Sequence, residues 1–252
     1  MELNLIWQWG TPSKIILLES DQVHVWRIEL THLIQTPTRY AHVLSMDEIS
    51  KASKFYFKDD RTKYICTRVT VREILGSYLE VEPEELVFAY NQYGKPYLEN
   101  QSREGSLNFN ISHAGNLSLL AVTKDRRIGV DLEPLRDEAS METIAKRFFA
   151  PAEVRQLLSF PDGLRQEAFF TCWTRKEAFV KAQGKGLSIP LDQFEVAFGP
   201  NEIPRLINTN NDTGETDSWS IFHLDPGPGY VGALVVEGKG VNVIGLDWPG
   251  HH

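Results

Sequence analysis

The chain has 252 residues, of which 42% are hydrophobic and 24% are charged, and its formal net charge is −8. A chain of this length can bury one large core or two smaller ones, and its acidic balance argues against nucleic acid as a partner. We find neither a signal-peptide pattern nor an apolar run of about 18 residues, so we expect no membrane span. The two cysteines, Cys66 and Cys172, stand outside any Cys-x-x-Cys or Cys/His cluster, which indicates reduced thiols in a cytoplasmic protein.

Hydrophobic periodicity predicts the elements of the first part of the chain. Residues 23–30 alternate as VHVWRIEL, which is typical of a strand with one solvent-facing side. We expect a helix to begin at Ser45, where Glu48 occupies the capping-box position. A long helix at 60–79 follows. Alternation and turn signals then predict short strands on either side of Gly94, and longer strands at 107–111, 117–123 and 127–133.

The second part of the chain shows the same order of patterns. Helices are predicted at 141–149, 151–158 and 166–183, and strands at 218–224 and 230–237, joined by the turn DPGPG. This order indicates two similar α+β halves that meet near residue 125, although ordinary hairpin periodicity would produce the same likeness. Residues 250–252, Gly-His-His, are a candidate tag remnant and are left out of the fold prediction.

The stretch RIGVDLEPL contains the first candidate site. Alternate side chains of a strand share a face, so Asp131 and Glu133 point to the same side. Two carboxylates at a strand end can share a hard cation such as Mg²⁺. A strand with a solvated acidic face is the alternative, and for an isolated Asp-x-Glu it is the commoner one.

The stretch FFTCWTRKEAFVKAQGKGL contains the second candidate site. On a helix, residues four apart share a face, so Trp173, Glu177 and Lys181 form one stripe. The alternative is a surface Glu–Lys pair beside a core aromatic residue. The Gly-Lys-Gly at 184–186 is either a helix stop or a mobile basic loop that closes over a phosphate.

The stretch NFNISHAG contains the third candidate site. Asn110, Ser112 and His113 offer several hydrogen-bonding groups at a strand-to-turn junction, which can bind an anion. A lone histidine is more often structural than functional. Lys95 stands on the turn YGKPYL, where a lysine is usually only solvated.

Together these fragments resemble the Sfp-type 4′-phosphopantetheinyl transferases. The matching motifs stand in the family's order and at its usual separations, over roughly residues 45–240. They are Gly94-Lys95-Pro96, Asn110-Ile111-Ser112-His113, Gly129-Val130-Asp131-Leu132-Glu133, Trp173-Thr174-Arg175-Lys176-Glu177-Ala178, and Lys181 followed by Gly184-Lys185-Gly186. Each motif alone has low specificity, whereas the set is highly specific.

The resemblance implies an α+β fold of two similar halves, 1–124 and 125–249, related by a pseudo-twofold axis. The second half carries the metal and catalytic motifs, and the active site lies in the cleft between the halves. The implied reaction moves 4′-phosphopantetheine from coenzyme A to a serine of an apo acyl or peptidyl carrier protein, and adenosine 3′,5′-bisphosphate leaves. The carrier would serve fatty-acid, polyketide or peptide synthesis. We expect a cytoplasmic monomer with no nucleic-acid or membrane partner.

The resemblance also implies roles for individual residues. Mg²⁺, or Mn²⁺ in its place, is expected on Asp131, Glu133 and Glu177. Glu177 is the candidate general base, directly or through water, and we expect its cationic neighbours to lower its pKa. Lys181 is expected to reach the same phosphates and to count with Glu177 as catalytic. The implied coenzyme contacts are Lys51, Lys95, Asn110, Ser112, His113 and Lys181.

One position departs from the family pattern. The family often carries two lysines, three residues apart, that are directed at the 3′-phosphate of the coenzyme. Lys51 matches the second of them, but Glu48 stands at the first. The residues that could compensate are Lys54, Lys58, Arg61 and Lys63.

Two other functions stay open from the residues alone. The first is a Mg²⁺-dependent phosphohydrolase, which would need a water-activating histidine beside the acids, and the sequence supplies none. The second is a carrier-binding module without catalysis, which would have no use for the intact set of acids and Lys181.

Overall fold

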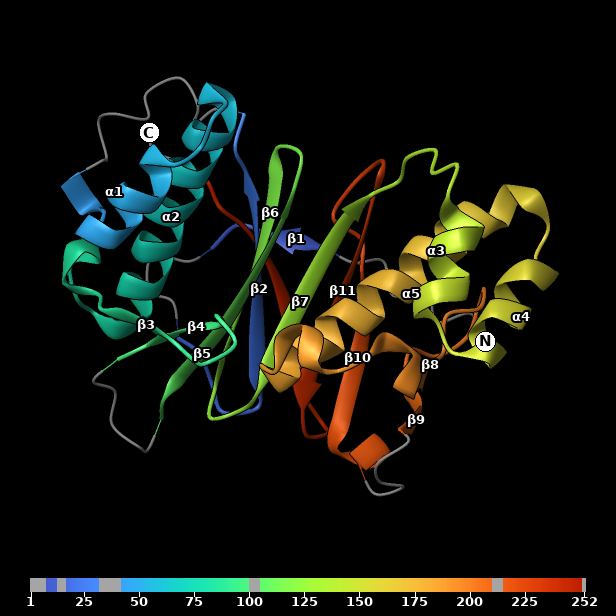
Figure 1. Cartoon of the computed structure of the whole chain (residues 1–252). Coiled ribbons are helices and arrows are strands. Elements are labelled where there is room, and N and C mark those ends of the chain that lie inside the picture. The colour runs from blue at the N-terminus through green and yellow to red at the C-terminus, as the bar shows by residue number, and fades with distance from the viewer. Residues whose placement is uncertain (1–7, 13–16, 32–41, 100–104, 210–214, 251–252) are drawn as a thin grey trace.

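The computed structural model of the chain describes residues 8–12, 17–31, 42–99, 105–209 and 215–250. Two sheets stand side by side, and each has helices packed on it (Figure 1). In the first half the elements are β1 Trp9–Gly10, β2 Gln22–Glu29, α1 Met46–Ser53, α2 Lys58–Leu79, β3 Phe88–Tyr90, β4 Pro96–Leu98, β5 Leu107–Ala114 and β6 Leu117–Lys124. In the second half they are β7 Ile128–Pro134, α3 Met141–Phe148, α4 Pro151–Ser159, α5 Asp162–Gln183, β8 Phe194–Val196, β9 Leu206–Thr209, β10 Trp219–Leu224, β11 Tyr230–Glu237 and β12 Asn242–Asp247.

The two halves repeat one topology. In the first, β5 and β6 form a hairpin and β6 pairs with β2, which gives the antiparallel order β2-β6-β5. In the second, β10 and β11 form a hairpin and β11 pairs with β7, which gives the order β7-β11-β10. Each half also places a 22-residue helix, α2 or α5, and a short hairpin between its first strand and its last two. The prediction of two similar α+β halves is therefore confirmed.

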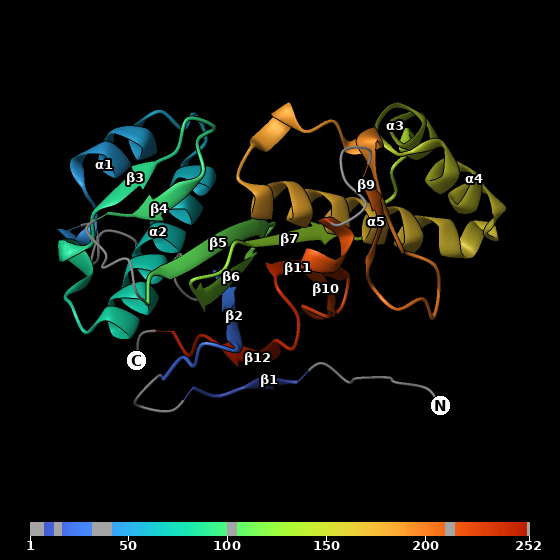
Figure 2. The same ribbon diagram turned by 90° about the horizontal axis from the view of Figure 1, so that it is seen from below.

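One strand from the end of the chain lies in the first sheet. β12 runs parallel to β2 and hydrogen bonds to it along its whole length, and β1 adds in parallel on the other side of β12. Figure 2 shows β1 and β12 beside β2, far from α5. The range 125–249 expected for the second half thus contributes a strand to the sheet of the first.

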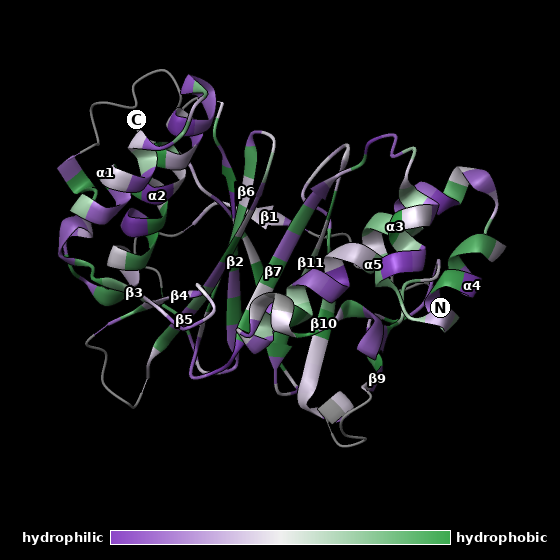
Figure 3. Cartoon of the chain, viewed as in Figure 1, coloured by the Kyte–Doolittle hydropathy of each residue, from purple (hydrophilic) through white to green (hydrophobic). Residues whose placement is uncertain are grey.

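Three buried clusters hold these layers together. One lies between the first sheet and α2 and includes Trp26 and Leu75. Another lies beneath α5 and includes Phe179 and Trp219. The third contains residues of both sheets, among them Val25 of β2 and Val130 of β7, so the two halves share a core. Figure 3 shows hydrophobic residues along the central strands and hydrophilic residues on the outer helix faces.

The sequence patterns predicted the long elements well. The strand at 23–30, the helix that begins after Ser45 and the strand at 127–133 are confirmed as β2, α1 and β7. Both cysteines are buried, and neither forms a disulfide within the described residues. Within the described residues, no helix combines the length and the hydropathy needed to cross a membrane.

Candidate active site

Strand β7 lies directly against helix α5, and a glycine permits this close approach (Figure 1). A Cβ atom at position 129 would overlap the carbonyl oxygen of Ala178 and would lie 3.0 Å from the Cα atom of Ala182. Only glycine leaves room for the backbone of the helix at this point. Gly129 therefore brings α5 close enough for the side chain of Lys181 to reach β7.

Lys181 joins the two halves at the centre of the site. Its Nζ atom donates to Asp131 Oδ1 at 2.6 Å, to Ser112 Oγ at 3.0 Å and to the carbonyl oxygen of Val130 at 3.2 Å. Ser112 Oγ in turn donates to Asp131 Oδ1 at 3.0 Å. Since Ser112 belongs to β5 and the others to β7 and α5, residues of both halves build the site.

Asp131 is buried, with only 5% of its surface exposed, so the alternative of a solvated acidic face is wrong for this residue. Its Oδ2 atom is also buried, and it has no hydrogen-bond partner among the described residues. An unsatisfied buried oxygen costs roughly 1–3 kcal/mol. A cation bound at Oδ2 would remove that cost.

The pKa of Glu177 differs from our expectation. We expected cationic neighbours to lower it, but burial and the negative charge of Asp131 raise it, and the ammonium of Lys181 opposes them only in part. Lys181 is closely paired with Asp131, which explains why its charge does not prevail at Glu177. Burial, Asp131 and Glu177 likewise raise the pKa of Glu133, against the weaker opposition of Arg136 and Lys181.

After burial, the negative charge of Asp131 contributes to the raised pKa of both Glu133 and Glu177, so these carboxylates lie within electrostatic range of one another. Their ligand atoms are all carboxylate oxygens, which suit a hard divalent cation, and Asp131 Oδ2 has an unfilled position. No group of three or more His, Cys, Asp or Glu side chains is already gathered around a common point in the described part of the chain. The chemistry of these donors and the orphaned Asp131 Oδ2 suit a cation, whereas the three carboxylates do not converge on one point, so the expected set of metal ligands stays a prediction.

Asn110 connects the two sheets beside this cluster. Its buried Oδ1 atom accepts a hydrogen bond from the backbone nitrogen of Val130 at 2.8 Å. This contact holds β5 against β7, so that Ser112 lies opposite Asp131. The structure thus gives Asn110 an architectural contact, and its implied coenzyme contact stays a prediction.

The charges of a group of lysines act on His113 at the end of β5. Desolvation lowers its pKa most, the ammonium groups of Lys181, Lys51 and Lys63 lower it further, and Asp131 raises it. Lys51 comes from α1 and Lys63 from α2. Positive charge from both halves therefore converges on this end of the site.

Glu48 does not face that group of cations. It is 1% exposed, and its carboxylate pairs with Arg68 and, at 2.8 Å, with Arg72, both from α2. Its Oε2 atom also accepts a hydrogen bond from the backbone nitrogen of Ser45 at 3.0 Å, as the capping box predicts. The departure from the family pattern is thus a buried ion pair. Of the four candidates to compensate for the missing lysine, Lys63 is the one whose charge acts on His113.

Two residues of the W-x-x-K-E-A motif are structural. Lys176 is fully buried, and its Nζ atom lies 2.7 Å from Glu153 Oε2 and donates to the carbonyl oxygens of Leu191 and Phe194 at 2.7 and 2.6 Å. Trp173 stacks on Phe169. These contacts fix α5 to its surroundings, and Lys181 reaches β7 from the same helix.

Lys95 reaches across from the first half to the second. Its Nζ atom donates to the carbonyl oxygens of Ile128 at 2.8 Å and Lys181 at 2.7 Å. Burial, with the charges of Arg127 and Lys181, lowers its pKa to about 8. Both partners are backbone carbonyl oxygens of the protein itself, and the implied contact of Lys95 with the coenzyme stays a prediction.

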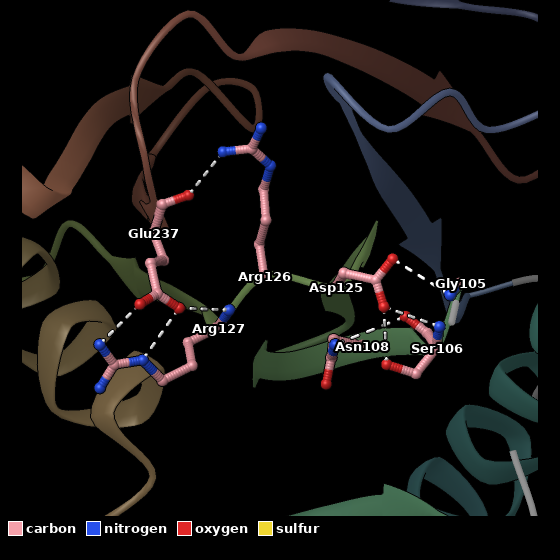
Figure 4. Close-up of a pocket in the computed structure, with 7 residues that line it drawn as sticks. All are labelled: Gly105, Ser106, Asn108, Asp125, Arg126, Arg127 and Glu237. Atoms are coloured by element: carbon pink, nitrogen blue, oxygen red, sulfur yellow. Dashed lines mark hydrogen bonds and ion pairs between the residues drawn. The ribbon is translucent and has the colours of Figure 1, made fainter. Parts of the chain in front are cut away.

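A pocket of about 520 Å³ lies elsewhere, at the beginning of β5 (Figure 4). Asp125 accepts hydrogen bonds there from Gly105 and Ser106, and Arg127 pairs with Glu237. Along β5, four residues, or roughly 13 Å, separate Asn108 of this pocket from Ser112. None of the predicted site residues lines it.

Comparison with known proteins identifies a family for both halves. Residues 127–235 match the model of the 4′-phosphopantetheinyl transferase superfamily, and residues 35–125 match a model described as 4′-phosphopantetheinyl transferase, N-terminal. The first match covers the acid motif, Glu177 and Lys181. The second covers Lys51, Lys95, Ser112 and the rest of the β5 motif.

Two individual relatives agree with these models. The chain is 42% identical to the 4′-phosphopantetheinyl transferase HetI of a Nostoc species over 229 residues, which are 91% of this chain and 93% of the relative. It is 34% identical to the 4′-phosphopantetheinyl transferase Sfp of Bacillus subtilis over 63% of this chain and 68% of that protein. The solved Thermotoga maritima holo-[acyl-carrier-protein] synthase aligns over 44% of this chain and 62% of its own, with 27% identity and a TM-score of 0.36.

Proposed function

The chain belongs to the 4′-phosphopantetheinyl transferase superfamily, and we propose that it transfers the 4′-phosphopantetheine group of coenzyme A to a serine hydroxyl of an apo carrier protein. The hydroxyl oxygen forms a bond to the β-phosphorus of the coenzyme, the pyrophosphate bond breaks, and adenosine 3′,5′-bisphosphate leaves. The observation that carries this proposal is the 42% identity to a transferase over nearly the full length of both chains. The cluster of Lys181, Asp131 and Ser112 supplies the matching chemistry.

The reaction needs neutralised phosphate charge, an oriented nucleophile and removal of the hydroxyl proton. Asp131, Glu133 and Glu177 would hold Mg²⁺ or Mn²⁺, and the cation would neutralise the pyrophosphate oxygens when bound. Lys181 adds a positive charge next to these acids. Lys51 and Lys63 supply positive charge at the His113 end of the site, which suits the 3′-phosphate.

Glu177 is the candidate base for the carrier serine, directly or through water. Its pKa is raised by burial and by Asp131, which makes it a stronger proton acceptor than an ordinary glutamate. Its place on the same helix as Lys181 keeps it near the phosphates. We also propose that the protein acts as a cytoplasmic monomer, and light scattering of the purified chain tests its oligomeric state.

One assay tests the proposal against its alternatives. The protein is incubated with coenzyme A, Mg²⁺ and an apo acyl or peptidyl carrier protein, and the carrier is weighed by mass spectrometry. A pantetheine adduct on the carrier supports the transferase. Release of adenosine 3′,5′-bisphosphate without an adduct would mean a phosphohydrolase, and carrier binding with neither product would mean a binding module.

A further inference from the structure

The end of helix α5 is held by a turn from the other half of the protein. The last carbonyl groups of a helix lack donors within the helix. Gly184, in the left-handed conformation with a φ of 67°, ends α5 and donates to the carbonyl oxygens of Val180 and Lys181. Two further donors come from the β3–β4 turn: Asn91 Nδ2 lies 2.7 Å from the carbonyl oxygen of Gly184, and Lys95 Nζ lies 2.7 Å from that of Lys181.

The turn that supplies these donors is itself well ordered. Asn91 Oδ1 accepts hydrogen bonds from the backbone nitrogens of Tyr93 at 2.9 Å and Lys95 at 3.0 Å, as in an Asx turn. Backbone hydrogen bonds from Asn91 to Lys95 and from Gly94 to Asn91 close it. The Oδ1 atom of Asn91 therefore builds the turn, while its Nδ2 atom reaches α5.

The same turn also fixes the strand opposite. Lys95 Nζ donates to the carbonyl oxygen of Ile128 in β7 as well as to that of Lys181 in α5. One ammonium thus bridges the helix that carries Lys181 and the strand that carries Asp131. A cation at a helix C-terminus is also favoured by the helix dipole.

We propose that Asn91 is a positioning residue, which together with Lys95 fixes the end of α5 so that the Lys181 ammonium stays on Asp131 and Ser112. We call Asn91 and Lys95 the turn clamp. The inference rests on the proposed function and deepens it, because it assigns a part in the reaction to a side chain that would touch neither substrate. Asn91 is the better residue to test, because Lys95 is also an expected coenzyme contact.

The sharpest variant is Asn91→Asp. Its carboxylate keeps the oxygen that accepts from Tyr93 and Lys95, but it replaces the donor to Gly184 with a second acceptor. Gln92→Glu is the matched control, because it adds the same charge one residue away on an exposed side chain. Wild-type activity on the carrier is measured first, so that a failure of the proposed function is seen before either variant is assayed.

We expect Asn91→Asp to lower kcat/KM for coenzyme A by about five- to tenfold, since small displacements of a positioning group are costly, while Gln92→Glu stays near the wild-type value. In a Lys181→Ala background, the additional loss caused by Asn91→Asp should shrink to less than about twofold, because the clamp acts through Lys181. Equal losses in the two backgrounds would overturn the proposal, as would wild-type kinetics of Asn91→Asp.

A second measurement does not depend on activity. Amide hydrogen exchange at residues 184–189 should be faster in Asn91→Asp than in Gln92→Glu, with the melting temperatures of the two variants compared alongside. Unchanged exchange there would contradict the clamp even if the enzyme proved inactive. If Asn91→Asp does not fold, Asn91→Ala replaces it in both measurements with the same expected outcomes.

Discussion

Gly129 in β7 and Ala178 in α5 meet backbone to backbone, with no side chain between the strand and the helix. This contact sets the depth at which α5 lies on its sheet. Because Lys181 follows Ala178 by one helical turn, it also sets the distance from which Lys181 reaches Asp131. The glycine of the acid motif is thus as much a part of the site as the carboxylates that follow it.

Replacement of Gly129 should therefore damage both the fold and the site. Gly129→Ala forces a methyl group into the backbone of α5, and we expect the free energy of unfolding to fall by about 1–3 kcal/mol. Gly163→Ala is the control: that glycine is exposed, in the same helix, and a Cβ there meets nothing within 4 Å. Urea unfolding should show Gly163→Ala unchanged or up to about 1 kcal/mol more stable. Equal stability of the two variants would contradict the close approach.

The two acids Asp131 and Glu177 should respond differently to added metal. Asp131→Asn removes a buried carboxylate and should weaken coenzyme A binding measured in Mg²⁺. Glu177→Gln keeps the shape but loses the proposed base, so its activity should stay about 10²–10⁴-fold low at saturating Mg²⁺. Calorimetric titration with coenzyme A in Mg²⁺ checks Asp131→Asn, and carrier modification over a Mg²⁺ series, followed by mass spectrometry, checks Glu177→Gln. Recovery of Glu177→Gln at high Mg²⁺ would leave Glu177 as a metal ligand alone, and near-wild-type activity at ordinary Mg²⁺ would remove Glu177 from the site.

Substitutions at Glu48 and Lys63 should have separate effects, the first on the stability of the fold and the second on coenzyme A binding. Glu48→Gln leaves Arg68 and Arg72 without their buried partner, and we expect a loss of about 3–5 kcal/mol in stability. Lys63→Ala should leave stability within about 0.5 kcal/mol but weaken coenzyme A binding by about 1.5–3 kcal/mol. Urea unfolding and calorimetric titration with coenzyme A measure the two effects. Undiminished binding by Lys63→Ala would mean that another cation takes the place of the missing lysine.

Acid should destabilise the protein through His24. Burial lowers the pKa of this histidine from 6.5 to about 4. Trp26 Nε1 donates to the Tyr78 hydroxyl, whose own hydrogen is then available to His24 Nδ1 at 2.6 Å. His24 binds a proton near pH 6.5 in the unfolded chain but only near pH 4 in the folded chain. The contribution of neutral His24 to the free energy of unfolding is therefore complete above about pH 6.5 and is lost as the pH falls toward 4. Between pH 7 and pH 5 the loss is about 2 kcal/mol.

Unfolding in urea at these two pH values checks the role of His24. His24→Gln should lose less stability between them than the wild type does, whatever its stability at pH 7. His42→Gln, at an exposed histidine, should keep the wild-type difference. If His24→Gln and the wild type lose the same amount, other groups account for the acid sensitivity.

Local sequence signals predicted the features that depend only on neighbouring residues, such as the start of a helix and the two faces of a strand. The capping box at Ser45 gave the start of α1, and alternation in β7 placed Asp131 and Glu133 on the face opposite Val130. The same signals could not place Glu48 in a buried ion pair, because its partners stand 20 and 24 residues further along the chain. Strand β12 was missed because six residues with one weak apolar stripe resemble many loops.

The pKa of Glu177 illustrates a second limit. Counting charges near it in the sequence favoured a low value, since lysines and an arginine surround it. In the fold, Arg175 and Lys176 are buried on other contacts and Lys181 is paired with Asp131, so burial and a neighbouring carboxylate prevail. The sign of such a shift depends on where each charge points, which spacing alone does not fix.

The return of β12 to the first sheet has a consequence for biosynthesis. A ribosome that has released only residues 1–125 has made β2 and β6 but not the strand that covers the other edge of β2. Until residues 242–247 emerge, the nascent first half therefore exposes one unpaired edge of β2. Such an edge is a template for pairing with other chains. Completion of the first sheet consequently waits for the synthesis of the second half, and an isolated first half is a poor unit for expression unless the β12 segment is supplied with it.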